Sequence, residues 1–176
     1  MAAITAVIIL SACSDSNNPV DPNNNNGEPV IKTPTSMQIQ TIFVSRFPEK
    51  KPDGSVWDWD PIFPLNARPD IFVRLNLDGS SSAIFRSKTE EQADYQYSHY
   101  FRDAASANDG SLPHNTGMNN VYRITLSDDD GIWGAEEIGS VYFNPANIYN
   151  NDNAETFDRS ITNGSVTIGI SGKWNY

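Results

Sequence analysis

Short segments in which apolar and polar residues alternate recur along this chain, and they restrict its fold more than any other feature. In the segment 71–77 the odd positions are Ile, Val, Leu and Leu, whereas Arg74 and Asn76 lie between them. The same alternation returns at 122–126 and 166–171. Successive side chains of a β-strand point to opposite faces of the sheet, so this period of two is typical of strands with one buried face. The chain is therefore predicted to be all-β.

Further short strands are expected near 83–86, 95–101 and 138–143, and Asn163-Gly164 between two strand-like runs predicts a two-residue hairpin turn. Seven or eight short strands in one domain favour an antiparallel β-sandwich. The first strand has apolar residues in two phases, which leaves open which face is buried: Met37, Ile39 and Phe43 in one phase, Ile42 and Val44 in the other.

The N-terminal residues resemble the signal of a bacterial lipoprotein. An apolar run at 2–10 and two small residues precede Cys13, the only cysteine of the chain. The run is shorter than the roughly 20 residues that span a bilayer, but it has the length of a signal-peptide core. The resemblance implies cleavage after residue 12, lipid on Cys13 and a place in the cell envelope, with the outer membrane preferred. An ordinary secretory signal is the alternative. Since no Lys or Arg precedes Lys32, we expect the natural signal to begin further upstream.

A polar segment separates this signal from the predicted domain. Residues 17–35 include six Asn and four Pro and show no apolar periodicity. Such a composition buries too little apolar surface to offset the entropy of ordering. Residues 13–35 are therefore predicted to form a lipidated, flexible tether, and residues 36–176 a single domain.

The charge of the chain limits its partners. The net charge is −10, with 22 acidic residues against 12 Lys and Arg. This balance argues against a nucleic-acid partner, because binding the phosphate backbone needs a basic surface. It also argues against direct contact with an anionic lipid surface unless a cation lies between the two.

Two predicted loops concentrate carboxylates. The first runs from the opening strand to Asp70, and the second follows the strand that begins at Tyr122 and reads DDDGIWGAEEIG from Asp128. Crowded carboxylates repel one another unless a cation binds among them, and calcium takes six to eight oxygen ligands. An EF-hand is excluded, because the fifth and sixth positions counted from Asp128 are Ile132 and Trp133.

These segments resemble the C2 domain family. The run PDIFVRL at 69–75 is similar to the signature strand of that family, and 124–139 is similar to its third calcium-binding loop. The resemblance implies an eight-stranded, C2-like sandwich whose loops converge on Ca²⁺ at one end. By motif, the implied ligands are Asp60, Asp70, Asp128, Asp130 and Glu136, with Asp58 as the alternative to Asp60. Pro69 precedes Asp70 instead of following it, and Glu136 replaces an aspartate; solvated acidic turns without a metal are the alternative.

Apolar side chains beside these carboxylates suggest a contact surface. In membrane-docking members of the family, apolar residues at the loop tips insert into the lipid interface, and Ile132 lies where one such residue would fall. Ile132 and Trp133 are therefore the expected contact residues. Trp also suits the boundary between water and lipid.

Catalysis finds little support in the sequence. His99 and His114 lie in no motif that supplies a nucleophile, and no phosphate-binding glycine loop or zinc spacing is present. A carboxylate pair for glycoside hydrolysis lacks an apolar neighbour that would raise one pKa. We therefore expect a binding protein and not an enzyme: a lipid-anchored envelope protein that docks through calcium on a membrane, glycan or protein. A calcium-independent structural module of a surface complex is the main alternative.

Overall fold

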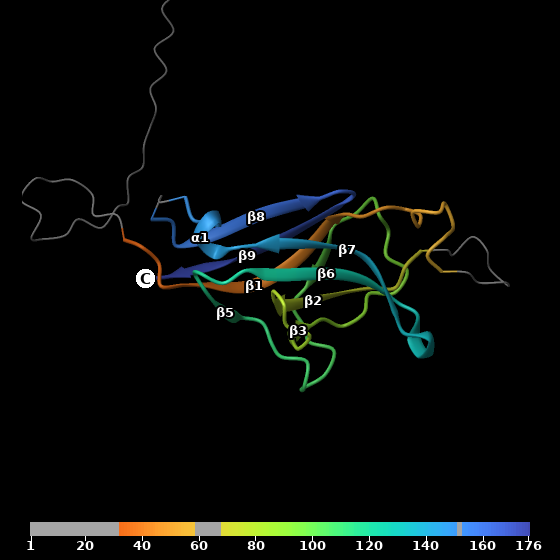
Figure 1. Ribbon diagram of the computed structural model, residues 1–176, viewed down its shortest axis with the longest axis horizontal. Coiled ribbons are helices and arrows are strands. Elements are labelled where there is room, and N and C mark those ends of the chain that lie inside the picture. Colours follow the sequence, from red (N-terminus) through yellow and green to blue (C-terminus); the bar gives the residue numbers. More distant parts are fainter. Residues whose placement is uncertain (1–31, 59–67, 151–152) are drawn as a thin grey trace, which may run out of the picture. The chain divides into compact units, whose positions relative to one another are not determined.

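The computed structural model describes residues 32–58, 68–150 and 153–176 (Figure 1). By its internal contacts the chain divides into two units, 1–31 and 32–176, and the described residues all belong to the second. The predicted signal peptide, Cys13 and most of the predicted tether lie outside the described residues, as does Asp60.

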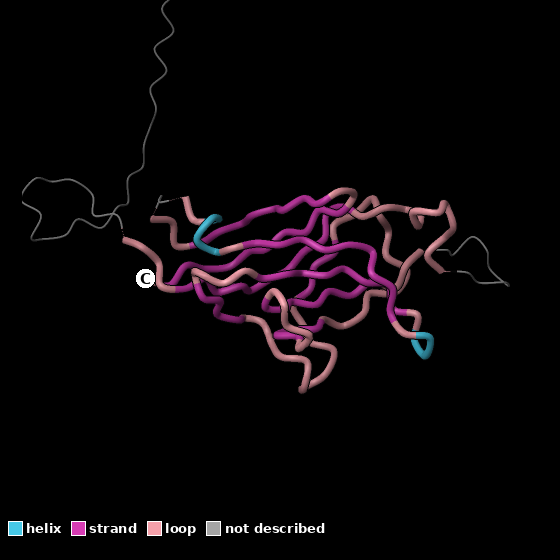
Figure 2. The backbone as a smooth tube through the Cα atoms, in the orientation of Figure 1, coloured by secondary structure: helices cyan, strands magenta, loops and turns pink. Residues whose placement is uncertain are grey.

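Two antiparallel sheets form a β-sandwich, which confirms the predicted fold class (Figure 2). One sheet has the order β4-β1-β9-β8, and β5 also pairs with β1; the other has the order β3-β2-β6-β7. The strands of the first sheet are β4 (His99–Phe101), β1 (Ser36–Arg46), β9 (Val166–Asn175), β8 (Thr156–Asn163) and β5 (His114–Gly117). Those of the second are β3 (Ala83–Arg86), β2 (Ile71–Leu77), β6 (Tyr122–Asp129) and β7 (Ala135–Phe143).

Two short helices connect strands of this sandwich. The 3₁₀ helix η1 (Gly131–Trp133) lies between β6 and β7, and α1 (Pro145–Ile148) follows β7. Within the described part of the chain, neither of these nor any other helix has the length and apolar character needed to cross a bilayer.

The nine strands of the described residues occupy eight positions. β9 pairs with one edge of β1, and the other edge is shared: β5 pairs with Ser36–Ile39 and β4 with Ile42–Val44. The two short strands therefore fill one position of the sheet in succession. The sandwich has two layers of four positions, as expected from the sequence.

Alternation along the strands builds the core. Ile71, Val73 and Leu75 of β2 are fully buried and pack between the sheets, as do Ile124 and Leu126 of β6. Side chains at alternate positions share a face, so the apolar face of each sheet points at the other.

Phe72 is also fully buried, although its neighbours in sequence face the core. The guanidinium carbon atoms of Arg74 and Arg86 lie 4.9 and 4.2 Å from its ring centroid and cover it on the outer face.

A bulge explains the two apolar phases of the first strand. The register between β1 and β9 shifts between Ile39 and Thr41. An extra residue in a strand turns the following side chains to the opposite face. Met37 and Ile39 before the bulge, and Ile42 and Val44 after it, therefore all reach the core. Phe43 instead lies on the outer face, where its ring covers Gly169 of β9.

Two local predictions need correction. The hairpin between β8 and β9 turns at Gly164 and Ser165, one residue further along than predicted, because Asn163 still pairs with Val166. Gly164 takes a φ of 58°, the left-handed backbone region that glycine adopts without strain. The strand predicted near 95–101 is limited to His99–Phe101.

Candidate metal centre

Three segments meet at the end of the sandwich away from the C-terminus (Figure 1). They are the loop after β1 (residues 47–58, the β1 loop), the residues before β2 (68–70) and the turn from β6 to β7 (130–134, the β6–β7 turn). Two hydrogen bonds join Asp70 to the end of β6, just before the turn: Asp70 N donates to Asp128 Oδ1 at 2.8 Å, and Asp129 N donates to the carbonyl of Asp70 at 2.7 Å.

Three carboxylates converge where these segments meet. One carboxylate oxygen of each of Asp58, Asp128 and Asp130 lies within 4.8 Å of the other two, and we call this set the acidic trio. Asp128 and Asp129 are the last two residues of β6, so their side chains point to opposite faces of the strand, and Asp130 follows directly after it. Asp129 accordingly turns away and accepts hydrogen bonds from Arg86 at 3.3 Å and from Thr89 at 2.7 Å.

Asp128 is the most unusual member of the acidic trio. Its side chain is fully buried, and Oδ1 accepts the bond from Asp70 N. Its Oδ2 atom has no hydrogen-bond partner among the described residues. Burial, and then the negative charge of Asp58, raise the pKa of Asp128 to about 7. A buried carboxylate with a free oxygen costs free energy unless a cation or a donor satisfies it.

The pKa of Asp58 in the β1 loop is raised as well. Burial raises the pKa of Asp58, and the charges of Asp70 and Asp130 raise it further, whereas Lys51 opposes them. A divalent cation placed among these carboxylates would reverse their repulsion, and oxygen ligands are those that hard cations such as calcium prefer. The acidic trio could therefore hold a metal ion.

Two of the other ligands implied by the sequence, Asp70 and Glu136, lie near the acidic trio. Asp70 lies close enough for its charge to raise the pKa values of Asp58 and Asp128, but its Oδ1 accepts a bond from Gln92 N at 2.7 Å. Glu136 pairs in register with Asp128 across β6 and β7, and its carboxylate binds Lys51 at 2.5 Å. Asp60 lies outside the described residues.

Lys51 is a residue of this site that the sequence did not reveal. Besides its bond to Glu136, its Nζ lies 5.5 Å from the ring centroid of Trp57. Trp57 is itself buried, and its indole N–H donates to the carbonyl of Pro48 at 2.9 Å. The hydrogen bond to Glu136 raises the pKa of Lys51; burial opposes it, and the charges of Glu136, Asp130 and Asp128 add to the rise. A lysine 85 positions away from its glutamate has no sequence signal that marks the pair.

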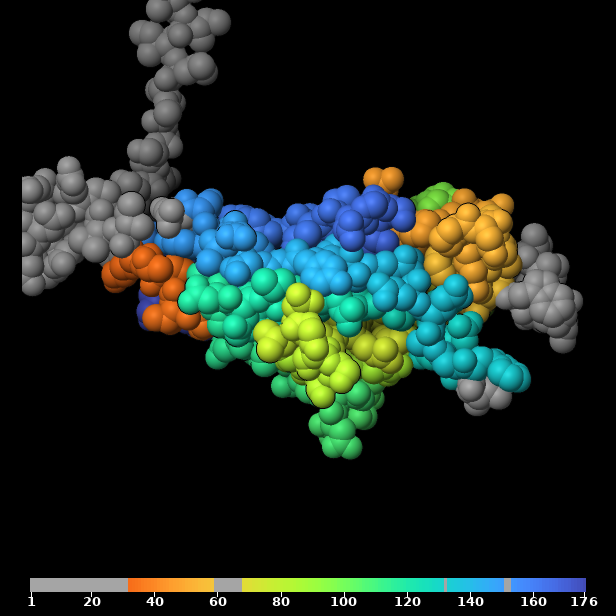
Figure 3. Space-filling model, in the orientation of Figure 1, coloured from red at the N-terminus to blue at the C-terminus, as the bar shows by residue number. Residues whose placement is uncertain are grey.

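The β6–β7 turn carries an exposed tryptophan beside the acidic trio. Trp133 closes η1, and 88% of its surface is accessible. The turn projects from the surface of the molecule, as the cyan region of Figure 3 shows. The side chain of Ile132 is outside the described part of the chain. Of the two predicted contact residues, the structure therefore describes the side chain of Trp133.

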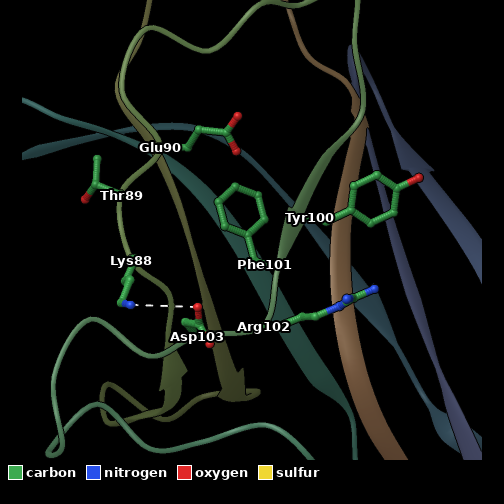
Figure 4. Close-up of a pocket in the computed structure, with 7 residues that line it drawn as sticks. All are labelled: Lys88, Thr89, Glu90, Tyr100, Phe101, Arg102 and Asp103. Carbon is green, nitrogen blue, oxygen red and sulfur yellow. Dashed lines mark ion pairs between the residues drawn. The ribbon is translucent and has the colours of Figure 1, made fainter.

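A cavity of about 520 Å³ opens elsewhere, between residues 88–90 and 100–103 (Figure 4). Its charged groups are engaged with other residues: Lys88 pairs with Asp103 at 3.7 Å, Glu90 with His99 at 2.7 Å, and Arg102 Nε donates to Thr41 at 3.1 Å. The acidic trio does not line it. The trio, with its buried and unsatisfied oxygen, is the stronger candidate site.

No family model matches the chain, and no curated protein matches it. Its solved neighbours include human GIVD cytosolic phospholipase A2 in complex with methyl gamma-linolenyl fluorophosphonate, at a TM-score of 0.49 and 12% identity over 82% of this chain and 18% of that chain. The C2A domain of plant extended synaptotagmin 1 matches at a TM-score of 0.42 and 10% identity, over 82% and 97% of the two chains. Extended synaptotagmin 2 (SMP, C2A and C2B domains) matches at 0.41 and 11%, over 81% and 27%.

The chain thus spans about a fifth of the phospholipase. The two antiparallel sheets of the described residues define the sandwich.

Proposed function

We propose that this protein is a calcium-dependent docking module of the C2 type, held at the bacterial cell envelope by lipid on Cys13. The observation that carries the proposal is the buried Asp128, whose Oδ2 lacks a partner among the described residues and belongs to a group of three carboxylates. A protein that needed Asp128 only for its fold would be expected to satisfy both oxygens.

Calcium is the ion that suits this group. It accepts irregular sets of six to eight oxygens, whereas magnesium requires a near-octahedral set at shorter distances. The acidic trio would supply the first ligands. Asp70 would be a further ligand, as would Asp60, and remaining positions would be open to water or to phosphate, carboxylate or sugar oxygens of a partner.

The bound cation would change what the loop end can contact. The chain carries a net charge of −10, so an anionic surface is repelled until a cation lies between the two. Trp133 stands exposed beside the acidic trio, and tryptophan is favoured at the boundary between lipid headgroups and hydrocarbon. An anionic lipid surface is therefore the partner chemistry that we propose first.

A vesicle experiment tests this function. The protein with Cys13→Ser should co-sediment with phosphatidylglycerol vesicles in calcium and be released by a chelator. Trp133→Ala should weaken the binding about tenfold while leaving calcium binding unchanged, because it removes an interfacial ring and no ligand. Tyr142→Ala, which truncates another exposed aromatic residue on β7, is the matched control.

The outcomes separate the candidate functions. Calcium binding without vesicle binding would direct the search to a glycan or protein partner. A folded protein that binds neither would favour the calcium-independent structural module. A catalytic role is not proposed: His99 is buried with both ring nitrogens engaged, by Glu90 at 2.7 Å and by the carbonyl of Asp94 at 2.8 Å.

The anchor has a separate test in cells. Cys13→Ser should release the protein from the membrane fraction, since lipid on the cysteine supplies the affinity that the polar domain lacks. Fractionation after a salt wash measures this. If the serine variant stays with the membranes, lipid on Cys13 is not the anchor.

A further inference from the structure

Lys51 lies beside the carboxylates of the acidic trio. Its charge lowers the pKa of Asp58, and the charges of Asp130 and Asp128 help to raise the pKa of Lys51. The side chain of Lys51 is 21% accessible, whereas Lys50 next to it is exposed. Lys51 is therefore the basic group that faces the trio from the β1 loop.

The position of Lys51 is fixed from two sides. Its ammonium group binds Glu136, which β7 holds in register opposite Asp128, and it lies over the ring of the buried Trp57. A cation–π contact and an ion pair each favour an ammonium group at this place over one in free solvent.

We infer that Lys51 is the internal cation of this site, which balances the acidic trio in the metal-free protein and competes with the divalent cation that binds there. Glu136 is the partner that holds the ammonium group at the rim of the trio. The inference rests on the proposed function, because it concerns what sets the affinity of the same site. It assigns Glu136 to the control of Lys51 and not to the coordination of the metal.

Lys51 and a divalent cation carry charges of the same sign. A divalent ion among the three carboxylates is repelled by an ammonium group that already shares their field. Removing that charge should tighten calcium binding about tenfold, which corresponds to about 1.4 kcal/mol. Lys51 would in this way keep the site responsive only to high calcium, in the range of 10⁻⁴–10⁻³ M that is usual for extracellular modules.

The first experiment is a calorimetric titration of the full chain with calcium. Lys51→Met, which keeps the length of the side chain without its charge, should bind calcium about tenfold more tightly than the natural protein. Lys50→Met makes the same change in net charge one residue away and should bind as the natural protein does. Lys51→Arg restores a positive charge and should return the affinity toward its original value. Circular dichroism without calcium verifies that each variant is folded.

The second experiment is a double-mutant cycle that separates the two roles of Glu136. If Glu136 acts by holding Lys51, Glu136→Gln frees the ammonium group to approach the trio and weakens calcium binding, but has no effect once Lys51 is Met. If Glu136 is a metal ligand, Glu136→Gln weakens binding equally in both backgrounds. The second pattern would overturn the role that we assign to Glu136.

The failure of this inference differs from the failure of the proposed function. If the natural protein binds calcium and Lys51→Met binds it equally or more weakly, the role of Lys51 is overturned. The metal site is then unaffected. Calcium binding by Lys51→Met alone would support the inference in its strongest form. Folded proteins that bind no calcium, with or without Lys51, would overturn both.

Discussion

Asp128→Asn is expected to stabilise the metal-free domain at pH 8 and, in the same protein, to abolish its response to calcium. The carboxylate of Asp128 is fully buried, and one of its oxygens has no partner among the described residues. Asparagine keeps the Oδ1 acceptor that Asp70 N uses, removes the buried charge and offers an N–H₂ donor to the neighbouring carboxylates. The substitution therefore removes the free-energy cost of burying a charged carboxylate, which the natural protein retains for its function.

The free energy of unfolding should depend on pH through the titration of Asp128. The pKa of Asp128 is raised from 3.8 to about 7 in the folded protein. Between these values the folded state keeps a proton that the unfolded state has released, so the free energy of unfolding decreases as the pH rises from about 4 to about 7. The cost is complete above pH 7. At about 1.4 kcal/mol for each pKa unit, it amounts to about 4 kcal/mol at most.

Denaturant unfolding in a chelator between pH 5 and pH 8 measures the effect. Asp128→Asn should gain stability relative to the natural protein as the pH rises, by about 2–4 kcal/mol at pH 8. Asp129→Asn is the matched control: it makes the same change one residue along β6, but its carboxylate is bound by Arg86 and Thr89. That variant should lose about 1 kcal/mol and keep its response to calcium. A loss of stability in Asp128→Asn at pH 8 would mean that the ionised carboxylate supports the fold and not a metal.

Much of the sandwich could be predicted because alternation is a local property. The run at 71–77 is β2 with Ile71, Val73 and Leu75 of the predicted apolar face inward, whereas Leu77 at the end of the strand is exposed; 83–86 is β3. The pairing of Asp128 with Asp130 was instead implied by the resemblance to the C2 loop, because Asp130 lies just beyond the end of β6. What could not be predicted depends on insertions and turns: the bulge between Ile39 and Thr41 reverses a phase that the sequence alone leaves ambiguous.

The sequence predicted the carboxylates of the candidate site but not Lys51. Carboxylates cluster visibly in the sequence, and the C2 resemblance suggested which of them to combine. The contribution of Lys51 depends on a loop that folds back through Trp57 and Pro48 and on a strand 85 positions away. Such a contact between distant segments leaves no periodicity or spacing to detect. The choice between Asp58 and Asp60 likewise depends on the path of a loop, and Asp60 lies outside the described residues.

Calcium is expected to raise the melting temperature of the domain by roughly 5–10 °C at ~10 mM. A ligand that binds only the folded state stabilises it by RT ln(1 + [L]/Kd). With a dissociation constant of about 10⁻⁴ M, the tight end of the extracellular range, ~10 mM calcium gives roughly 2.7 kcal/mol. Differential scanning calorimetry of the natural protein and of Asp128→Asn/Asp130→Asn makes the comparison.

The double variant should melt at one temperature whether calcium is present or not, because it lacks two carboxylates of the acidic trio. Asp129→Asn should keep the full shift, since Asp129 points away from the trio toward Arg86. Magnesium at the same concentration should do far less, because loops from separate strands do not enforce the tight octahedral set that it requires. An unchanged melting curve of the natural protein in ~10 mM calcium would limit any site to a dissociation constant well above 10⁻³ M, outside the range that functions in such modules. Asp58, Asp128 and Asp130 would then have to be explained as a repulsive cluster that Lys51 alone makes tolerable.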